Sequence, residues 1–238
     1  MGSLVRRGGG VLGDTPTPAA FEGVLRVKSL EEDKRHFREA LVLSLNHLLD
    51  LKDLETGRHS TRLAGWARRI AVQLGLDEQA LADVEMASLL HDVGKVGVPD
   101  RVLRKRGPLR STDRRAIEKH PEYGWGVLRV FPGLQDVALF VLHHHERMDG
   151  RGYPGRLAGD DIPLGSRIVS VVDTFDAMTS SRPYRKALSV REALQRLDAA
   201  AGTQFDRTIV RCFISLAAEL VIEEAAASRA QDDTAHWT

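Results

Sequence analysis

Apolar residues recur at the spacing of an α-helix along most of the chain after residue 28. The first series consists of Phe37, Leu41, Leu45 and Leu48, which advance by four, four and three residues and so form one stripe of a long helix. We predict that this stripe packs against the core of its own domain. The alternative is a helix that forms a homodimer and connects to an upstream sensor.

The same periodicity predicts further helices and almost no strands, so the predicted fold class is all-α. One helix covers residues 63–74 and stops at Gly75, because glycine readily adopts the left-handed backbone that ends a helix. Another begins near Thr112, where Ser111 or Thr112 is expected to be the cap. The remaining helices are expected at about 78–92, 127–142 with a break at Pro132-Gly133, 166–180, 189–201 and 206–224.

Glycine and proline mark the segments that interrupt this helical pattern. Residues 147–165 contain five glycines and two prolines, which predicts a long irregular loop. Loops of this length inside compact domains are commonly functional. We therefore predict a flexible leader or linker at 1–28, one functional domain at 29–224 and a polar tail at 225–238.

Composition and charge exclude several classes of protein. The chain has 34 basic and 33 acidic residues, a net charge of +1, so no general field draws in a nucleic-acid polymer. Its one cysteine, Cys212, allows neither an internal disulfide nor a thiolate metal cluster. The longest apolar runs, such as 137–142, are far shorter than the ~20 residues that span a bilayer. We predict a cytoplasmic protein that does not enter the membrane.

Histidines gather in one part of the sequence. Six of the nine lie between His59 and His145, and three of these are consecutive. Histidine is the commonest metal ligand, and carboxylates accompany it around iron, manganese and zinc. His91-Asp92 follows an apolar helix, so the aspartate is expected to be buried and to need a metal or a hydrogen-bonding partner.

Other candidates are ambiguous from their own residues. Glu55 and His59 are four residues apart, which suits either one face of a helix or a surface pair. His120 alone means little. At most two of the three consecutive histidines can converge on one centre, because neighbours on a helix point in different directions. Asp173 lies among β-branched core residues and needs a metal or an ion pair, and Asp176 is either its partner or a ligand.

Three segments together resemble a known family, the HD-GYP phosphodiesterases, which are a branch of the HD phosphohydrolases. The segments are 91–95 (HDVGK), 144–146 (HHE) and 149–154 (DGRGYP). The resemblance continues at 162–164, 167–168, 173–179, 182–185 and 202–206 and spans about residues 53–210. One departure is Arg207, which stands where the family commonly has proline after Phe205-Asp206 and leaves the start of that helix in doubt.

The resemblance implies an HD-domain-like helical bundle with a Gly-Tyr-Pro loop beside a centre of two or three divalent metal ions, iron first and manganese next. In the family Asp92 bridges two ions, and Lys95 is expected to act in catalysis as well. Lys95, Arg182, Arg185 and Tyr153 match substrate-contacting positions, and the loop also suggests a signalling partner. The metal ligands carried over from the family are Glu55, for a third ion, with His59, His91, Asp92, His120, His144, His145 and Asp173.

The expected activity is hydrolysis of cyclic di-GMP, to pGpG and/or GMP, by attack of a hydroxide that bridges two metal ions. Two alternatives remain open. The chain could act on another cyclic dinucleotide, or it could be a non-catalytic module that binds a nucleotide or a protein. The sequence identifies neither the metal, the final product, the input signal, the oligomeric state nor the acid that protonates the leaving group.

Overall fold

The computed structural model describes Asp33 and residues 36–38, 40–49, 56–105, 107–180 and 186–218. The chain divides into two compact units, 1–41 and 42–238. In the first unit the described residues are helical. The predicted leader and tail lie outside the described residues, as do Glu55, Arg182 and Arg185 and the side chain of His59.

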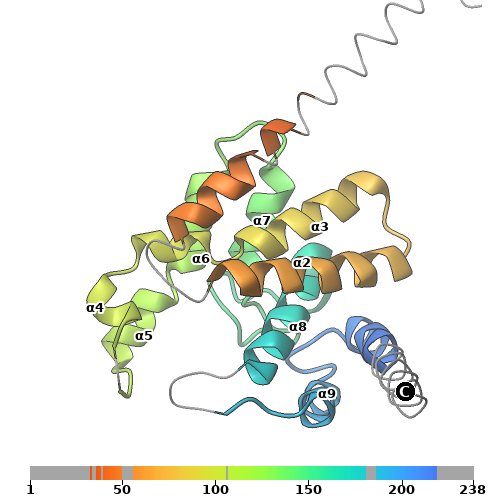
Figure 1. Cartoon of the computed structure of the whole chain (residues 1–238). Coiled ribbons are helices and arrows are strands. Elements are labelled where there is room, and N and C mark those ends of the chain that lie inside the picture. The colour runs from red at the N-terminus through yellow and green to blue at the C-terminus, as the bar shows by residue number, and fades with distance from the viewer. Residues whose placement is uncertain are drawn as a thin grey trace, which may run out of the picture. The chain divides into compact units, whose positions relative to one another are not determined.

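The second unit is built from helices joined by short turns and one long loop (Figure 1). No β-strand occurs among the described residues, which confirms the all-α prediction. No described helix is long and apolar enough to cross a bilayer. The elements are a helical segment at 42–49, α2 (Thr56–Gln73), α3 (Glu78–Leu90), the 3-10 helix η1 (Val93–Gly97), α4 (Asp100–Leu103), α5 (Ser111–Ile117), α6 (His120–Leu128), α7 (Gln135–His143), the 3-10 helix η2 (Gly159–Asp161), α8 (Leu164–Thr179), α9 (Val190–Ala199) and a helical segment at 207–218.

The core forms where α2, α3, α8, α9 and the 207–218 helix bury their apolar faces against one another. The partly buried Trp66 of α2 packs against this core, with its ring edge-on to Phe213 at 5.0 Å and to Phe175 at 6.3 Å. Such pairs add to the free energy gained by burying the rings. On the other side, α6 packs against η1 and α7, and α7 also contacts α3 and α8. The ends of four elements are thereby brought together.

The predicted apolar stripe on the first helix is wrong in register. Val42 and Leu49 are buried, whereas Leu48 is 54% exposed. The buried pair is seven residues apart, two helical turns, so both side chains lie on one face. The helix has apolar residues at 41, 42, 45, 48 and 49, and of these only Val42 and Leu49 are buried.

Most helix boundaries agree with the sequence pattern, with two corrections. The predicted helix at 127–142 is wrong, because residues 129–134 are not helical and separate the end of α6 from α7, a wider break than Pro132-Gly133 alone. Gly75 follows α2 with a φ of 75°, in the left-handed region as predicted. Helix α5 begins at Ser111, so neither Ser111 nor Thr112 is its cap, and Asp113 instead accepts a hydrogen bond from the Arg110 backbone at 3.1 Å. Arg207 does not disturb the last helix, because Asp206 accepts from the backbone of Thr208 at 2.8 Å.

Candidate metal centre

Ligand-type side chains from four parts of the chain meet at one place. His91 and Asp92 follow α3, His120 opens α6, His144 and His145 follow α7, and Asp173 lies within α8. The His91 Nε2 atom lies 3.2 Å from Asp92 Oδ2 and 3.8 Å from Asp173 Oδ1. His120 Nε2 lies 3.4 Å from Asp92 Oδ1. These six residues are the ones that the sequence predicted for this site and that the structure describes.

Three of the histidines are oriented by the same backbone contact. In each, Nδ1 lies within hydrogen-bond distance of the carbonyl oxygen three residues earlier. A carbonyl can only accept, so Nδ1 carries the proton and Nε2 keeps its lone pair. The contacts join His91 to Ser88 at 2.9 Å, His120 to Ile117 at 2.8 Å and His144 to Val141 at 2.6 Å.

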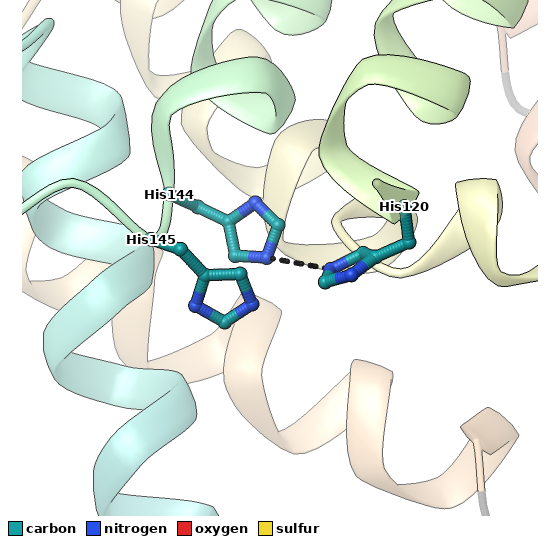
Figure 2. Close-up of side chains that lie close together, drawn as sticks. All are labelled: His120, His144 and His145. Atoms are coloured by element: carbon teal, nitrogen blue, oxygen red, sulfur yellow. Dashed lines mark hydrogen bonds between the residues drawn. The ribbon is translucent and has the colours of Figure 1, made fainter. Parts of the chain in front are cut away.

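The Nε2 atoms of His120 and His144 face each other at 3.3 Å, as the dashed line in Figure 2 shows. Because both rings hold their proton on Nδ1, this contact needs a shared proton or a cation between two lone pairs. His145 lies beside the pair, and one nitrogen from each of the three rings falls within 4.8 Å of the other two. The donor set fits a transition-metal ion, for which imidazole nitrogen is a preferred ligand.

Asp92 is buried between two histidines and a lysine. Its Oδ1 faces His120, and its Oδ2 faces His91 and lies 2.7 Å from the Lys95 ammonium. Burial acts to raise the pKa of this carboxyl, but the positive charge of Lys95 is the largest opposing cause, and the pKa lies well below its usual range. Asp92 is therefore an ionised carboxylate whose two oxygens point toward different histidines.

The buried histidines are held neutral. Burial is the main cause that lowers the pKa of His120, of His144 and of His145, the last to about 4. Neighbouring imidazoles lower the pKa of His144 and His145 further, because two adjacent positive rings repel each other. Neutral imidazole is the form that coordinates a metal, so the cluster is ready to bind one at neutral pH.

A loop between α7 and α8 covers one side of the cluster. The Tyr153 ring lies 4.9 Å from the His145 ring with 31° between their planes, and the Tyr153 backbone donates to the His145 carbonyl at 3.3 Å. A Cβ on Gly152 would lie 2.6 Å from the His145 carbonyl oxygen, closer than real side chains come. Likewise, a Cβ on Gly94 would collide with the His120 carbonyl oxygen.

Glu146 anchors the loop, a role that the sequence reasoning did not assign to it. Its buried carboxylate accepts hydrogen bonds from the backbones of Gly155 at 2.6 Å and Leu157 at 3.1 Å, and so ties the loop to the end of α7. His143 Nδ1 lies 3.5 Å from the same carboxylate, which accounts for the one histidine of the three that was not predicted to be a ligand. A charged residue directly before a glycine-rich loop was the available signal.

Asp176 pairs with an arginine. Arg62 of α2 meets it with two hydrogen bonds, Nε to Oδ1 at 2.8 Å and Nη2 to Oδ2 at 3.1 Å. Of the two roles left open for Asp176, the structure therefore supports that of an ion-pair partner, here of Arg62. The expected roles of Glu55, His59, Arg182 and Arg185 rest on side chains outside the described residues.

The fold and the cluster of histidines and aspartates at its helix ends agree with the comparison to known families. A family model described as "HD domain" matches residues 44–209. The chain belongs to the HD-domain family.

Curated relatives are named as phosphodiesterases. A cyclic di-GMP phosphodiesterase of Thermotoga maritima is 37% identical over 194 residues, 81% of this chain and 52% of the relative. The cyclic di-GMP phosphodiesterase response regulator RpfG of Xanthomonas campestris is 39% identical, over 81% and 51%. The 3'3'-cGAMP-specific phosphodiesterase 2 of Vibrio cholerae is 37% identical, over 78% and 36%. The chain spans about half the length of the first two relatives.

Solved structures show the same fold. The cyclic GMP-AMP specific phosphodiesterase V-cGAP3 of V. cholerae superposes with a TM-score of 0.56 at 26% identity, covering 74% of this chain and 48% of that one. Bd1817, an HD-GYP-type protein of Bdellovibrio bacteriovorus, gives a TM-score of 0.57 at 19% identity, over 69% and 53%, and shows the likeness of fold alone.

Proposed function

We propose that this chain is a metal-dependent phosphodiesterase that hydrolyses cyclic di-GMP. The observation that carries the proposal is the convergence of three imidazoles whose Nδ1 atoms are engaged by the backbone, beside an ionised Asp92. In this arrangement the Nε2 atoms of His120 and His144 face each other at 3.3 Å while both Nδ1 atoms are engaged by carbonyls, which suits a bound cation. Relatives named as cyclic di-GMP phosphodiesterases support the choice of substrate.

Two divalent ions would be held by the six described residues of the cluster, iron being the first expectation and manganese the second. Asp92 would bridge them, because its two oxygens face different histidines. Bound divalent ions supply Lewis acidity toward a phosphoryl oxygen and lower the pKa of a water molecule. Glu55 and His59 are the proposed additional ligands, Glu55 for a third ion.

The chain's own cations would act on the phosphate. The Lys95 ammonium, 2.7 Å from Asp92, keeps that carboxylate ionised and lies where it can approach a phosphoryl oxygen at the cluster. Arg182 and Arg185 are proposed to hold the substrate phosphates, since a guanidinium can bind two oxygens at once. Tyr153 borders the site from the loop and would contact the nucleotide.

A second candidate substrate is a mixed guanine-adenine cyclic dinucleotide. The relatives from V. cholerae named as 3'3'-cGAMP-specific phosphodiesterases favour it, one of them at 37% identity. The non-catalytic alternative is the weaker one, because the six described side chains of the cluster are all competent ligands and none is replaced by an inert residue. We propose that the product is GMP if Glu55 holds a third ion and pGpG if only two ions bind.

The test is a metal analysis combined with turnover by the same preparation. Protein purified without chelator is expected to carry at least two transition metals per chain and to hydrolyse cyclic di-GMP faster than 3'3'-cGAMP. Asp92→Ala serves as the inactive control and Glu122→Gln, on the exposed side of α6, as the active one. Less than one metal per chain with no gain on reconstitution, or a metal-loaded protein that cleaves neither nucleotide, contradicts the proposal.

A further inference from the structure

A pocket of about 440 Å³ is lined in part by Tyr153, whose ring also contacts His145 of the histidine cluster. This volume lies within the usual range for small-molecule sites, roughly 300–1,000 Å³. The Tyr153 ring lies 4.9 Å from the His145 ring, so the pocket and the cluster share this side chain as a neighbour. A ligand in the pocket would therefore be a near neighbour of any phosphate held at the cluster. The lining residues are Glu118, Gly150, Arg151, Gly152, Tyr153 and Arg156.

The charged groups that line the pocket are available to a ligand. Among the described residues, the Glu118 carboxylate and the Arg151 and Arg156 guanidinium groups make no ion pair or side-chain hydrogen bond with one another or with other residues. The pocket therefore offers a ligand the two acceptor oxygens of the carboxylate, the N–H donors of the two guanidinium groups and the ring face of Tyr153.

The backbone of Arg156 supports a role for its side chain. Its φ is 54°, in the left-handed region, where a residue with a Cβ is less stable than glycine. The two contacts between Glu146 and the loop, at Gly155 and Leu157, flank Arg156 and hold it in this conformation. Glycine would be more stable at this position, so the presence of arginine indicates that its guanidinium has a role.

These groups match the hydrogen-bonding edges of guanine. Guanine presents two adjacent donors, N1–H and the 2-amino group, which a carboxylate can accept together. Its O6 and N7 are two adjacent acceptors, the pair that arginine binds with two hydrogen bonds. Its face stacks on tyrosine. A phosphate is a poor occupant beside Glu118, because the two negative charges repel. Adenine is also a poor occupant, because its N1 accepts and would face the carboxylate.

We infer that this pocket binds one guanine base of the substrate, with Glu118 selecting guanine over adenine and Arg156 binding the opposite edge. The inference rests on the proposed function for the identity of the whole substrate. It adds a specificity-determining residue that contacts neither metal nor phosphate. Glu118 reaches the pocket because it directly follows α5, two residues before His120 opens α6.

Glu118→Gln is the discriminating variant. Glutamine keeps the shape of glutamate but offers one acceptor and one donor, which match the 6-amino group and N1 of adenine. We expect kcat/KM for cyclic di-GMP to fall roughly 10- to 100-fold, while kcat/KM for cyclic di-AMP stays level or rises. Glu122→Gln, one turn along the chain on an exposed position, is the matched control and should keep the wild-type preference.

Two further measurements separate base recognition from damage to the metal site. Glu118→Gln should keep the wild-type metal content and the wild-type rate on bis(p-nitrophenyl) phosphate, which has no base. Arg156→Gly removes the guanidinium and suits the local backbone, so it should raise KM for cyclic di-GMP several-fold with the melting temperature unchanged or higher.

Binding of mononucleotides distinguishes failure of this inference from failure of the proposed function. Wild-type protein should bind GMP more tightly than AMP by calorimetry, and Glu118→Gln should lose that difference, whether or not the protein turns over any dinucleotide. If wild type cleaves neither a dinucleotide nor the nitrophenyl ester, the proposed function fails and this measurement still decides the pocket. Equal binding of GMP and AMP by wild type, or an unchanged preference in Glu118→Gln, overturns the inference.

Discussion

His120 and His144 point their Nε2 atoms at each other across 3.3 Å, although the Nδ1 of each ring faces a backbone carbonyl. Without a cation between them, the two lone pairs would be in contact within a buried site. A bound cation converts the repulsion into coordination, so metal binding and folding should be thermodynamically coupled.

We therefore expect a chelator to lower the melting temperature of metal-loaded protein. The reason is that a ligand that binds only the folded state stabilises it, by about 2.7 kcal/mol at a hundredfold excess over Kd. Scanning calorimetry with and without EDTA measures the shift. In His144→Ala the shift should shrink, because one of the paired nitrogens is gone. An equal shift in melting temperature in wild type and variant would show that His144 does not bind the metal.

Asp92→Asn should reduce both metal content and activity while leaving a folded protein. The amide keeps the size of the carboxylate but loses the charge that faces Lys95, His91 and His120. Loss of a ligand should reduce activity at least as much as loss of a supporting residue, so more than ~100-fold. Elemental analysis, circular dichroism and turnover are the measurements. A folded, metal-replete variant with near-wild-type activity would refute the bridging role.

Arg62→Ala should destabilise the protein by about 1–3 kcal/mol, because it leaves the buried Asp176 carboxylate without its guanidinium. Arg62 itself is 53% exposed and Asp176 only 8%, so the penalty comes from the aspartate. Urea unfolding of Arg62→Ala, Asp176→Ala and the double variant gives the coupling energy.

Arg68→Ala provides the control for that cycle. Arg68 lies on the same helix, and its pair with Glu85 at 3.3 Å is exposed on both sides, 43% and 41%. Exposed pairs contribute less than about 1 kcal/mol. If both arginine variants lose the same stability, burial of Asp176 does not matter.

The metal-free protein should lose stability as the pH falls from about 6.5. The folded pKa values of His120, His144 and His145 lie below that of an unfolded histidine, so the unfolded state binds more protons in this range. His145, with a pKa of about 4, contributes on the order of 3 kcal/mol, present above pH 6.5 and lost by pH 4. Urea unfolding in EDTA at several pH values, with His145→Gln as the flatter comparison, measures this loss. A profile that stays level from pH 7 to 5 would contradict the buried neutral cluster.

Gly94→Ala should be destabilising by about 1–3 kcal/mol and should reduce metal content, because its new methyl group must displace the His120 carbonyl. Gly65→Ala is the control. Nothing lies within 4 Å of a Cβ at Gly65, which is inside α2, so alanine should stabilise that helix by about 0.5–1 kcal/mol. Opposite signs for the two glycines are the expected result, read from thermal melts and metal analysis of both variants.

The helical periodicity was sufficient to predict the fold class and most helix boundaries, because a stripe of apolar residues has few ways to be buried. It was insufficient for the first helix, where a band of apolar residues at 41, 42, 45, 48 and 49 gives no single face. It also predicted the wrong cap for α5, because the Asp113 side chain accepts a hydrogen bond from the backbone of Arg110.

The site was predicted through a resemblance rather than from spacing. Nothing in the residues around His120 marks it, since it becomes a neighbour of Asp92 and His144 only when α6 packs on η1 and α7. The proposed role of Glu118 and the loop contacts of Glu146 could not be predicted either, because both depend on where the loop folds back. The homodimer, the signalling partner, the location, the metal ligands and the substrate contacts all stay predictions.

Two close contacts between main-chain segments fix the backbone position of the ligand residues. Gly94 touches the carbonyl of His120, and Gly152 touches the carbonyl of His145. Anyone who grafts this centre onto another helical scaffold would have to transfer these two glycines with the histidines and aspartates. If only the coordinating side chains were transferred, the main-chain segments could separate by the width of a methyl group. This displacement would move the metal ligands out of position.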